Sequence, residues 1–393
     1  STPLYSSAAS DVYKRQELWR FSFLDDNLSD AQMYSEKLVR LQPEYPQSYI
    51  AYLASNKKSG TIRSMRSKLT QLVPNFTPPM IKNFHSWIRE DQAKKIIEAL
   101  NHDFKNRSVD EIKISEIDQT IRNLLFTIRK LNKWMQPQRR FSSLGTDLLG
   151  AKSFLKPSPL GTVGIISPWN FPVGLIFYPL ASVFAAGKRA MVKPSEITPA
   201  TANIIKEGVE KYFDISELAV ITGGPSVGEQ FSGLKLDHLL FIGSNRVAKK
   251  VAAQAAKNLV PTTLELGGKS PTIIGTNANM ALAAERILFS KTLNAGQICL
   301  SPDYIFVKKD QERNLISELQ KAYSKFFPEP NSHDQTSMVN KHHLKRMNSY
   351  LLDATNKGAT VESLGKNDDL NSCLLYTSPS PRDRTRARMP SSA

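Results

Sequence analysis

The sequence predicts an α/β protein built on a doubly wound parallel sheet, followed by a second α/β unit. The main observation is the order of elements. From about residue 160 onward, short apolar segments alternate with helix-patterned segments, which is typical of parallel strands joined by helical crossovers. Size and composition agree, because 393 residues, 40% hydrophobic and 22% charged, suit two or three globular domains and argue against a disordered or fibrous chain.

The first part of the chain has a helical pattern. Segment 88–100 places its apolar side chains on one stripe, and 114–135 repeats this pattern, so residues 17–141 are expected to be mainly helical. Segment 42–83 is irregular. An extended stretch is expected at 149–159.

The alternating region then predicts the strands and helices of the sheet. The expected strands are 161–166, 189–193, 218–221, 238–242 and 262–266, and the expected helices are 174–186, 199–212 and 245–257. A further helix and the strand 303–307 flank Cys299.

Composition excludes several classes of protein. Two cysteines cannot form a disulfide framework, and the first twenty residues lack the apolar core of a signal peptide. The longest uncharged stretch, 157–187, contains Pro168, Pro172 and Pro179, which would interrupt a membrane-spanning helix. We therefore expect a cytoplasmic protein without a membrane span.

The two ends of the sequence look unlike the rest. Residues 1–16 and 373–393 lack apolar periodicity, and the second segment, with alternating arginines, resembles a translated library adapter. We expect both to be non-native. The net charge of +16 then becomes smaller and dispersed, so a basic nucleic-acid-binding protein is the less favoured interpretation.

Two glycine-containing segments are candidates for a phosphate site. Residues 241–245, FIGSN, place the end of a strand directly before a helix, whose free N–H groups suit a phosphate, although a simple capped helix start explains Ser244 equally well. Residues 222–228, TGGPSVG, have the wrong spacing for a dinucleotide fingerprint, and a glycine turn explains them.

Cys299 and Glu265 are the candidate reactive groups. Cys299 follows Gly296 in NAGQICLSPDY, where a turn can direct the thiol and its own N–H into one cavity; inert packing is the alternative. Glu265 lies at the end of a predicted strand, where partial desolvation would suit it to accept a proton from water. An ion pair with Lys269 is the alternative for Glu265.

Asn170 is a candidate hydrogen-bond donor to an oxyanion. It lies in ISPWNFP between Pro168 and Pro172, so its amide can be held rigidly toward a developing negative charge, while an Asx turn is the alternative. Lys193 and Glu196 end the second strand. A carboxylate there accepts hydrogen bonds from a ribose diol and repels a 2′-phosphate, which favours NAD over NADP.

Five ordered motifs resemble the aldehyde dehydrogenase superfamily, and its coniferyl-aldehyde and fatty-aldehyde branch most closely. They are PLGTVGIISPWNFP, AAGKRAMVKPSEITPAT, DHLLFIGS, NLVPTTLELGGKSP and NAGQICLSPDY. The resemblance implies a doubly wound NAD-binding domain at 160–264 and a catalytic α/β domain at 265–372. It also implies an oligomerisation arm at 142–159, and from this arm a homodimer.

The resemblance also implies roles for individual residues. Cys299 would be the nucleophile, Glu265 the general base and Asn170 the oxyanion donor, with an aldehyde and water as reactants and no metal. The expected cofactor contacts are Ile166, Ser167, Pro168, Trp169, Lys193, Ser195, Glu196, Gly243, Ser244 and Leu266. The expected substrate contacts, for an aromatic or long-chain aldehyde, are Phe171, Trp134 and Phe177.

The chain departs from the family pattern at its end. Family members continue for about another hundred residues, so we expect an incomplete catalytic domain that lacks its last strands. A CoA-acylating dehydrogenase is an alternative function, although such relatives generally lack a carboxylate at the place of Glu265. An inactive truncated fragment is a further alternative.

Overall fold

The computed structural model describes residues 90–141, 150, 152–328, 335–364 and 376–377, all within one compact unit, 77–393. The expectations for residues 1–16 and 42–83, for 142–149 of the arm, and for nearly all of 373–393 fall outside the described residues. So does the part of the 17–141 expectation that precedes Glu90.

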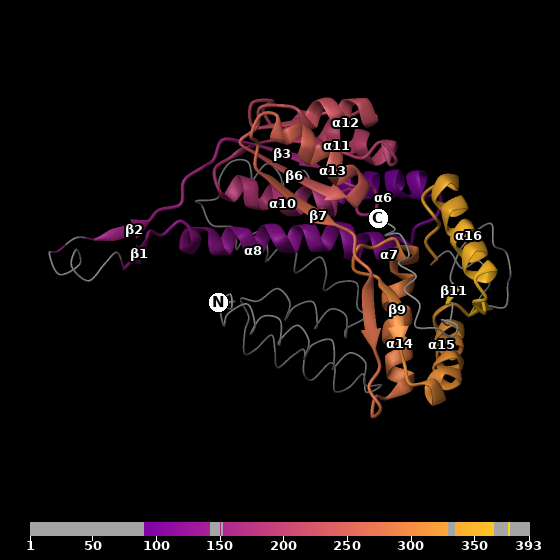
Figure 1. The fold of residues 1–393 in the computed structure, drawn as a ribbon. Coiled ribbons are helices and arrows are strands. Elements are labelled where there is room, and N and C mark those ends of the chain that lie inside the picture. Colours follow the sequence, from indigo (N-terminus) through magenta and orange to yellow (C-terminus); the bar gives the residue numbers. More distant parts are fainter. Residues whose placement is uncertain (1–89, 142–149, 151, 329–334, 365–375, 378–393) are drawn as a thin grey trace. The chain divides into compact units, whose positions relative to one another are not determined.

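A five-stranded sheet with all neighbours parallel forms the centre of the described part, in the order β5-β4-β3-β6-β7 (Figure 1). Its strands are β3 (Thr162–Ile166), β4 (Arg189–Lys193), β5 (Leu218–Val220), β6 (His238–Gly243) and β7 (Thr262–Leu266). The chain starts at the central strand β3, extends the sheet to one side through β4 and β5, and then returns to the other side through β6. The predicted doubly wound sheet is confirmed.

Helices cover the sheet because its central strands are apolar on both faces. In β3, Val163, Ile165 and Ile166 are buried, and α10 (Gly174–Ala185) packs against both β3 and β4. The other helices of this part are α11 (Pro199–Tyr212), α12 (Pro225–Ser232) and α13 (Asn245–Ala256). The expected glycine turn is present at Gly223, whose φ is 153°, but the second half of segment 222–228 begins helix α12, which the sequence did not predict. Proline at its first position favours a helix start, which the glycine spacing concealed.

The helices that precede the sheet form a further layer. They are α6 (Glu90–Phe104), α7 (Val109–Ile112), the π-helical segment η1 (Lys113–Asp118) and α8 (Gln119–Trp134). Helix α8 packs on α10, and α6 packs on α11. After α8, β1 (Gln138–Arg140) pairs antiparallel with β2 (Ser153–Leu155). Strand β2 lies in the extended stretch expected at 149–159, whereas β1 and the pairing were not predicted.

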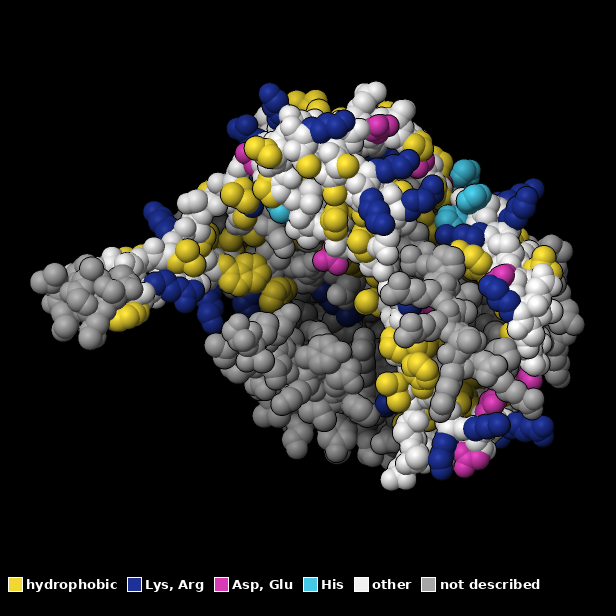
Figure 2. Space-filling model, viewed as in Figure 1, with side chains coloured by type: hydrophobic (Ala, Val, Ile, Leu, Met, Phe, Trp, Pro, Cys, Tyr) yellow, Lys and Arg dark blue, Asp and Glu magenta, His cyan; other side chains and the backbone are white. Residues whose placement is uncertain are grey.

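A second α/β layer follows the sheet. Strands β8 (Ser270–Ile273) and β9 (Pro302–Phe306) are parallel, and the helices α14 (Met280–Thr292) and α15 (Glu312–Phe326) share an apolar core with them. Helix α16 (Lys341–Asn356) comes next, followed by the two short paired strands β10 (Glu362–Ser363) and β11 (Tyr376–Thr377). Figure 2 shows hydrophobic side chains gathered over β9, where Tyr304 and Phe306 are exposed.

Candidate active site

The carboxyl ends of four strands meet at one edge of the sheet. Ile166, Lys193, Gly243 and Leu266 are the last residues of β3, β4, β6 and β7, and the register pairs Ile166 with Lys193 and Gly243 with Leu266. The chain adds β4 and β5 on one side of β3 and then β6 and β7 on its other side. The reversal of direction lies between β3 and β6, and α/β sheets bind ligands at such a topological switch point.

One cavity of about 2730 Å³ opens at this edge and reaches the second layer. It is larger than the roughly 300–1,000 Å³ of a site for one small ligand, so it has room for a dinucleotide and a substrate. Thirteen of the sixteen sequence-predicted site residues line it: Ile166, Ser167, Pro168, Trp169, Asn170, Lys193, Ser195, Glu196, Gly243, Ser244, Glu265, Leu266 and Cys299.

Lys193 and Glu196 form an ion pair at the end of β4. Lys193 Nζ lies 2.6 Å from Glu196 Oε2; the lysine side chain is buried, whereas 39% of the glutamate side chain is exposed. The ammonium group has three hydrogens, so it keeps donors beyond this pair. A buried cation beside a half-exposed carboxylate can therefore bind a group that both donates and accepts hydrogen bonds, such as a ribose diol.

Helix α13 begins at the end of β6. The Ser244 side chain accepts a hydrogen bond from Val247 N at 3.4 Å, so it caps the helix as in the simpler interpretation of this motif. Packing explains why position 243 is a glycine, since a Cβ there would come within 2.7 Å of the Phe241 ring. Backbone N–H groups of the first turn then remain as the candidate donors to an anion.

Cys299 lies on the loop between η2 (Leu293–Gly296), which follows α14, and β9. Three consecutive residues of η2, Asn294, Ala295 and Gly296, have φ values of 50°, 53° and 72°. This left-handed backbone is costly for Asn and Ala, about 1–3 kcal/mol each, and turns the chain sharply before the thiol. Of these three residues, only Gly296 is predicted from the sequence to form a turn.

The thiol of Cys299 is free and exposed to the cavity. Desolvation by the surrounding cavity walls raises the pKa of Cys299, and the negative charge of Glu265 raises it further. The N–H groups of Cys299 and Leu300 oppose both effects. Cys299 and Glu265 both line this cavity.

The surroundings of Glu265 differ from the expectation. The side chain is exposed at the cavity wall on β7, the edge strand of the described sheet, so it is less desolvated than expected. The alternative ion pair does not form either, since Lys269 pairs with Asp303 at 3.0 Å. Glu265 is thus available to contact water.

Asn170 reaches across the cavity to the Cys299 loop. Its Nδ2 donates to Gln297 O at 3.0 Å, and Asn294 Nδ2 donates to Asn170 O at 2.9 Å. Gln297 connects the same loop to a third segment, because its Nε2 donates to Ser337 O and its Oε1 accepts from Val339 N. The amide of Asn170 has two hydrogens and this contact uses one, which leaves one donor for a ligand.

His343 of α16 is a cavity residue that sequence analysis missed. Its ring lies 4.8 Å from that of Trp169, centroid to centroid, and burial together with the charges of Arg346 and His342 lowers its pKa to about 4. Only a long-range contact brings α16 to the loop after β3, so no local sequence signal marks this histidine.

The three expected substrate contacts do not line the cavity of the described part. Phe171 lies under the Arg107 guanidinium, 5.0 Å from Cζ to the ring centroid. Trp134 ends α8 and packs edge-on against Phe126, and Phe177 is 1% exposed in the core. Helix α10 is covered on most of its surface, so an aromatic residue on it fills the core.

Two further findings concern metals and membranes. In the part of the chain that the structure describes, no group of three or more His, Cys, Asp and Glu side chains is arranged to hold a metal ion. Within the same residues, no helix combines the length and the apolar composition needed to cross a bilayer.

The sequence profile of the aldehyde dehydrogenase family matches residues 80–379. The chain belongs to this family, as its motifs predict. It is 48% identical over 294 residues to the "Probable coniferyl aldehyde dehydrogenase" of Caulobacter vibrioides, and 42% identical over 272 residues to the coniferyl aldehyde dehydrogenase of a Pseudomonas species. These matches cover 72% and 69% of this chain, and 60% and 56% of the two relatives.

A solved structure gives the same result for the fold. The substrate-bound state of Staphylococcus aureus AldH superimposes with a TM-score of 0.70 at 35% identity, covering 78% of this chain and 66% of that one. The resemblance to the coniferyl-aldehyde branch is confirmed. This chain spans about 60% of the length of the curated relatives.

Proposed function

We propose that this protein oxidises an aldehyde to the carboxylic acid through a thioester on Cys299, with NAD as the hydride acceptor. The observation that carries the proposal is the convergence of Cys299, Glu265 and Asn170 on one cavity at the carboxyl edge of the sheet. Family membership supports the same reaction. The names of the relatives favour coniferyl aldehyde or a related aromatic aldehyde as substrate.

The residues at the sheet edge fit a nicotinamide dinucleotide. Glu196 and Lys193 offer an acceptor and a donor to a ribose diol, and the first turn of α13 offers N–H groups to the pyrophosphate. Residues 166–169, Ser195 and Leu266 would complete the binding surface. The Glu196 carboxylate would repel a 2′-phosphate, which supports NAD over NADP.

The chain's own residues account for the covalent steps. Cys299, as the thiolate, adds to the aldehyde carbonyl, and the second amide hydrogen of Asn170 and the Cys299 N–H stabilise the resulting oxyanion. The bound nicotinamide ring supplies the acceptor for the hydride that leaves the former carbonyl carbon. Glu265 then takes a proton from water, whose oxygen attacks the thioester carbonyl and expels the thiolate with the acid as product.

Residues 142–159, which resemble the arm, support a homodimer as part of the proposal. Strand β2 presents Phe154 and Leu155 to solvent, 57% and 55% exposed, and large exposed apolar side chains are typical of surfaces that associate. Sedimentation of the purified chain at several concentrations tests this assembly separately from the chemistry.

The test of the chemistry is the mass of Cys299 after incubation with coniferyl aldehyde and NAD. We expect an acyl adduct that accumulates in Glu265→Gln, and free acid as the product of the unsubstituted chain. The Cys299→Ser variant is the control and forms no adduct. A folded Glu265→Gln variant that never acquires the acyl mass would overturn the proposal, and an adduct released only by CoA would favour the acylating reaction.

A further inference from the structure

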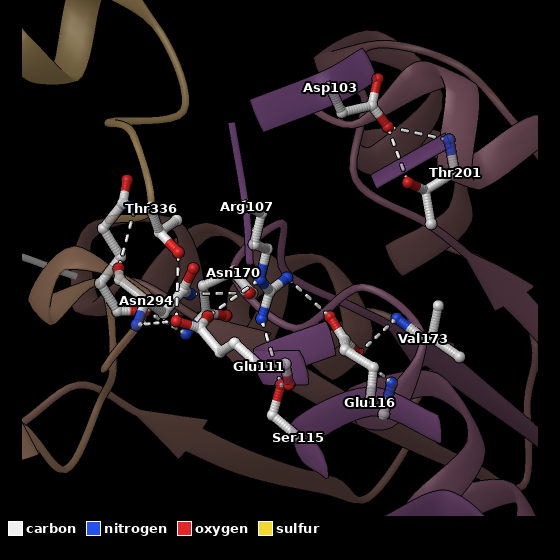
Figure 3. A network of polar contacts seen from close by, with 12 residues as sticks. Asp103, Arg107, Glu111, Ser115, Glu116, Asn170, Val173, Thr201, Asn294 and Thr336 are labelled. Carbon is white, nitrogen blue, oxygen red and sulfur yellow. Dashed lines mark hydrogen bonds and ion pairs between the residues drawn. The ribbon is translucent and has the colours of Figure 1, made fainter. Parts of the chain in front are cut away.

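Three charged side chains are buried beneath the two loops of the proposed site (Figure 3). They are Arg107, Glu111 and Glu116, hereafter the charged bridge, from the turn before α7, from α7 and from η1. The side chains of Arg107 and Glu116 are 0% exposed and that of Glu111 is 9% exposed. None of the three has a role predicted from the sequence.

Glu111 holds the Cys299 loop. Its Oε2 accepts a hydrogen bond from Asn294 N at 3.0 Å and another from Thr336 Oγ1 at 3.1 Å. Asn294 is the first of the three left-handed residues, and its own side chain donates to Asn170 O. The carboxylate therefore fixes the point at which the strained turn begins.

Glu116 holds the Asn170 loop. Its Oε2 accepts hydrogen bonds from Val173 N at 3.2 Å and Gly174 N at 2.7 Å, where this loop enters α10. Burial raises the pKa of Glu116, and the Arg107 charge and these two N–H groups oppose the rise. The π-helical turn η1 carries Glu116, and such turns are frequent at functional sites.

Arg107 joins the two carboxylates. Its Nε donates to Glu111 Oε1 at 3.1 Å and its Nη1 to Glu116 Oε1 at 2.9 Å. The guanidinium plane also lies over the Phe171 ring, one residue after Asn170. A planar guanidinium fork holds both acids in one fixed geometry, whereas the ammonium group of a lysine lies on a flexible stem and lacks this fork.

Stability alone does not explain such an arrangement. Buried ion pairs are costly to desolvate, and well-packed apolar residues of similar volume are often as stable or more stable. A rigid, fully hydrogen-bonded network instead fixes the relative position of what it binds. Here its outer contacts are backbone N–H groups on the loops that carry Cys299 and Asn170.

We propose that Arg107, Glu111 and Glu116 are positioning residues that hold the Cys299 loop and the Asn170 loop in one fixed relation. The inference rests on the proposed function, because only that function makes this relation catalytically important. It predicts that a change at one end of the charged bridge is felt at the other end. A misplacement of about 1 Å at reacting groups can lower a rate by roughly 10²-fold.

Amide hydrogen exchange of the full chain, read by mass spectrometry, tests the coupling directly. In Glu116→Gln we expect faster exchange at Val173 and Gly174, and also at residues 294–297, which Glu116 does not touch. The expected increase is about tenfold at both places, corresponding to local opening. Exchange that rises only at Val173 and Gly174 would overturn the proposal.

Asp103 provides a matched control. It is also a buried carboxylate of this helical layer, and it accepts hydrogen bonds from Thr201 N at 2.8 Å and Ala200 N at 3.1 Å. These two residues lie at the start of α11, so Asp103 binds neither of the two loops. In Asp103→Asn we expect faster exchange at residues 200–201 and no change at 294–297. A rise at 294–297 in this variant would mean general loosening and would count against the charged bridge.

Aldehyde oxidation gives the second readout. We expect kcat to fall about 10²-fold in Glu111→Gln while KM for the aldehyde stays within about twofold, because the change displaces reacting groups and leaves the binding surface in place. An unchanged kcat in a variant whose amide exchange rises both at 173–174 and at 294–297 would overturn the positioning role. If the unsubstituted chain forms no thioester, the proposed function fails by itself, and the exchange measurement still decides whether the bridge couples the loops.

Arg107→Lys is the alternative if Glu116→Gln does not fold. It keeps the positive charge but lacks the rigid fork that spans both carboxylates, so we expect faster exchange at 173–174 and at 294–297 together. Exchange at both places equal to that of the unsubstituted chain would overturn the proposal.

Discussion

Asn170 Nδ2 donates to Gln297 O at 3.0 Å, so the loop after β3 is bound directly to the loop that carries Cys299. The two residues lie 127 positions apart in the sequence. The contact joins the sheet to the second layer at the point where the proposed reaction takes place. It also orients the amide, since one of its hydrogens is fixed by the carbonyl.

The first prediction concerns the oxyanion. Replacing Asn170 by alanine removes the side-chain donor, so we expect kcat for aldehyde oxidation to fall about 10²–10³-fold, the usual effect of losing one such donor. Steady-state kinetics measure it. Asn123→Ala is the control, because Asn123 also donates to a backbone carbonyl, that of Tyr178, and does not line the cavity. A loss of less than about fivefold would show that Asn170 is not an oxyanion donor.

The second prediction concerns the proton acceptor. In Glu265→Gln we expect normal formation of the thioester but slow hydrolysis, because no carboxylate takes the proton from water. Rapid quenching followed by mass measurement of Cys299 gives both rates. Glu285→Gln, which breaks an exposed pair with Lys325, is the control. Hydrolysis that keeps its rate in Glu265→Gln assigns the base to another group.

The third prediction concerns the pH dependence of thiol reactivity. The pKa of Cys299 is raised by desolvation and by Glu265, so the thiolate forms only at pH values above those of an ordinary cysteine. Alkylation by iodoacetamide should therefore rise with pH, and its midpoint should move to lower pH in Glu265→Gln. A midpoint that does not move in this variant would show that the charge of Glu265 does not affect the pKa of Cys299.

The fourth prediction concerns stability in acid. Burial lowers the pKa of His343 to about 4 in the folded chain, whereas the same histidine in the unfolded chain has a pKa of about 6.5. As the pH falls, His343 is therefore protonated in the unfolded chain before it is protonated in the folded chain. His343 therefore contributes stability above pH 6.5 that is lost toward pH 4, on the order of 1–3 kcal/mol. His343→Phe keeps an aromatic ring beside Trp169 and should show a weaker loss of unfolding free energy between pH 7 and 4.5. An identical pH dependence in the two chains contradicts this assignment.

The local sequence pattern was sufficient to predict the strands and the edge of the sheet at which the cavity opens. β3, β4 and β6 are short apolar runs bounded by turn residues, and parallel order follows from the helices between them. Helix α12 was missed because Gly223 and Gly224 look like a turn until the proline after them starts a helix. The environment of Glu265 was misjudged, since nothing local marks β7 as an edge strand.

The interior of the site depends on contacts that no local pattern encodes. Glu111 and Glu116 look in the sequence like polar positions of ordinary helices, yet they accept hydrogen bonds from Asn294 N and Gly174 N, 183 and 58 residues away. Phe177 shows the reverse error. An aromatic residue near the site in sequence was taken as a substrate contact, whereas α10 turns it into the core.

The left-handed backbone at Asn294 and Ala295 has a consequence for protein engineering. Glycine at position 295 would relieve strain and raise the melting temperature, as substitutions that suit a positive φ do. The same relaxation would give the Cys299 side chain more conformations. Thermostabilised variants of this protein should therefore be selected for the proposed turnover as well as for heat resistance, because the strained turn makes the two properties compete.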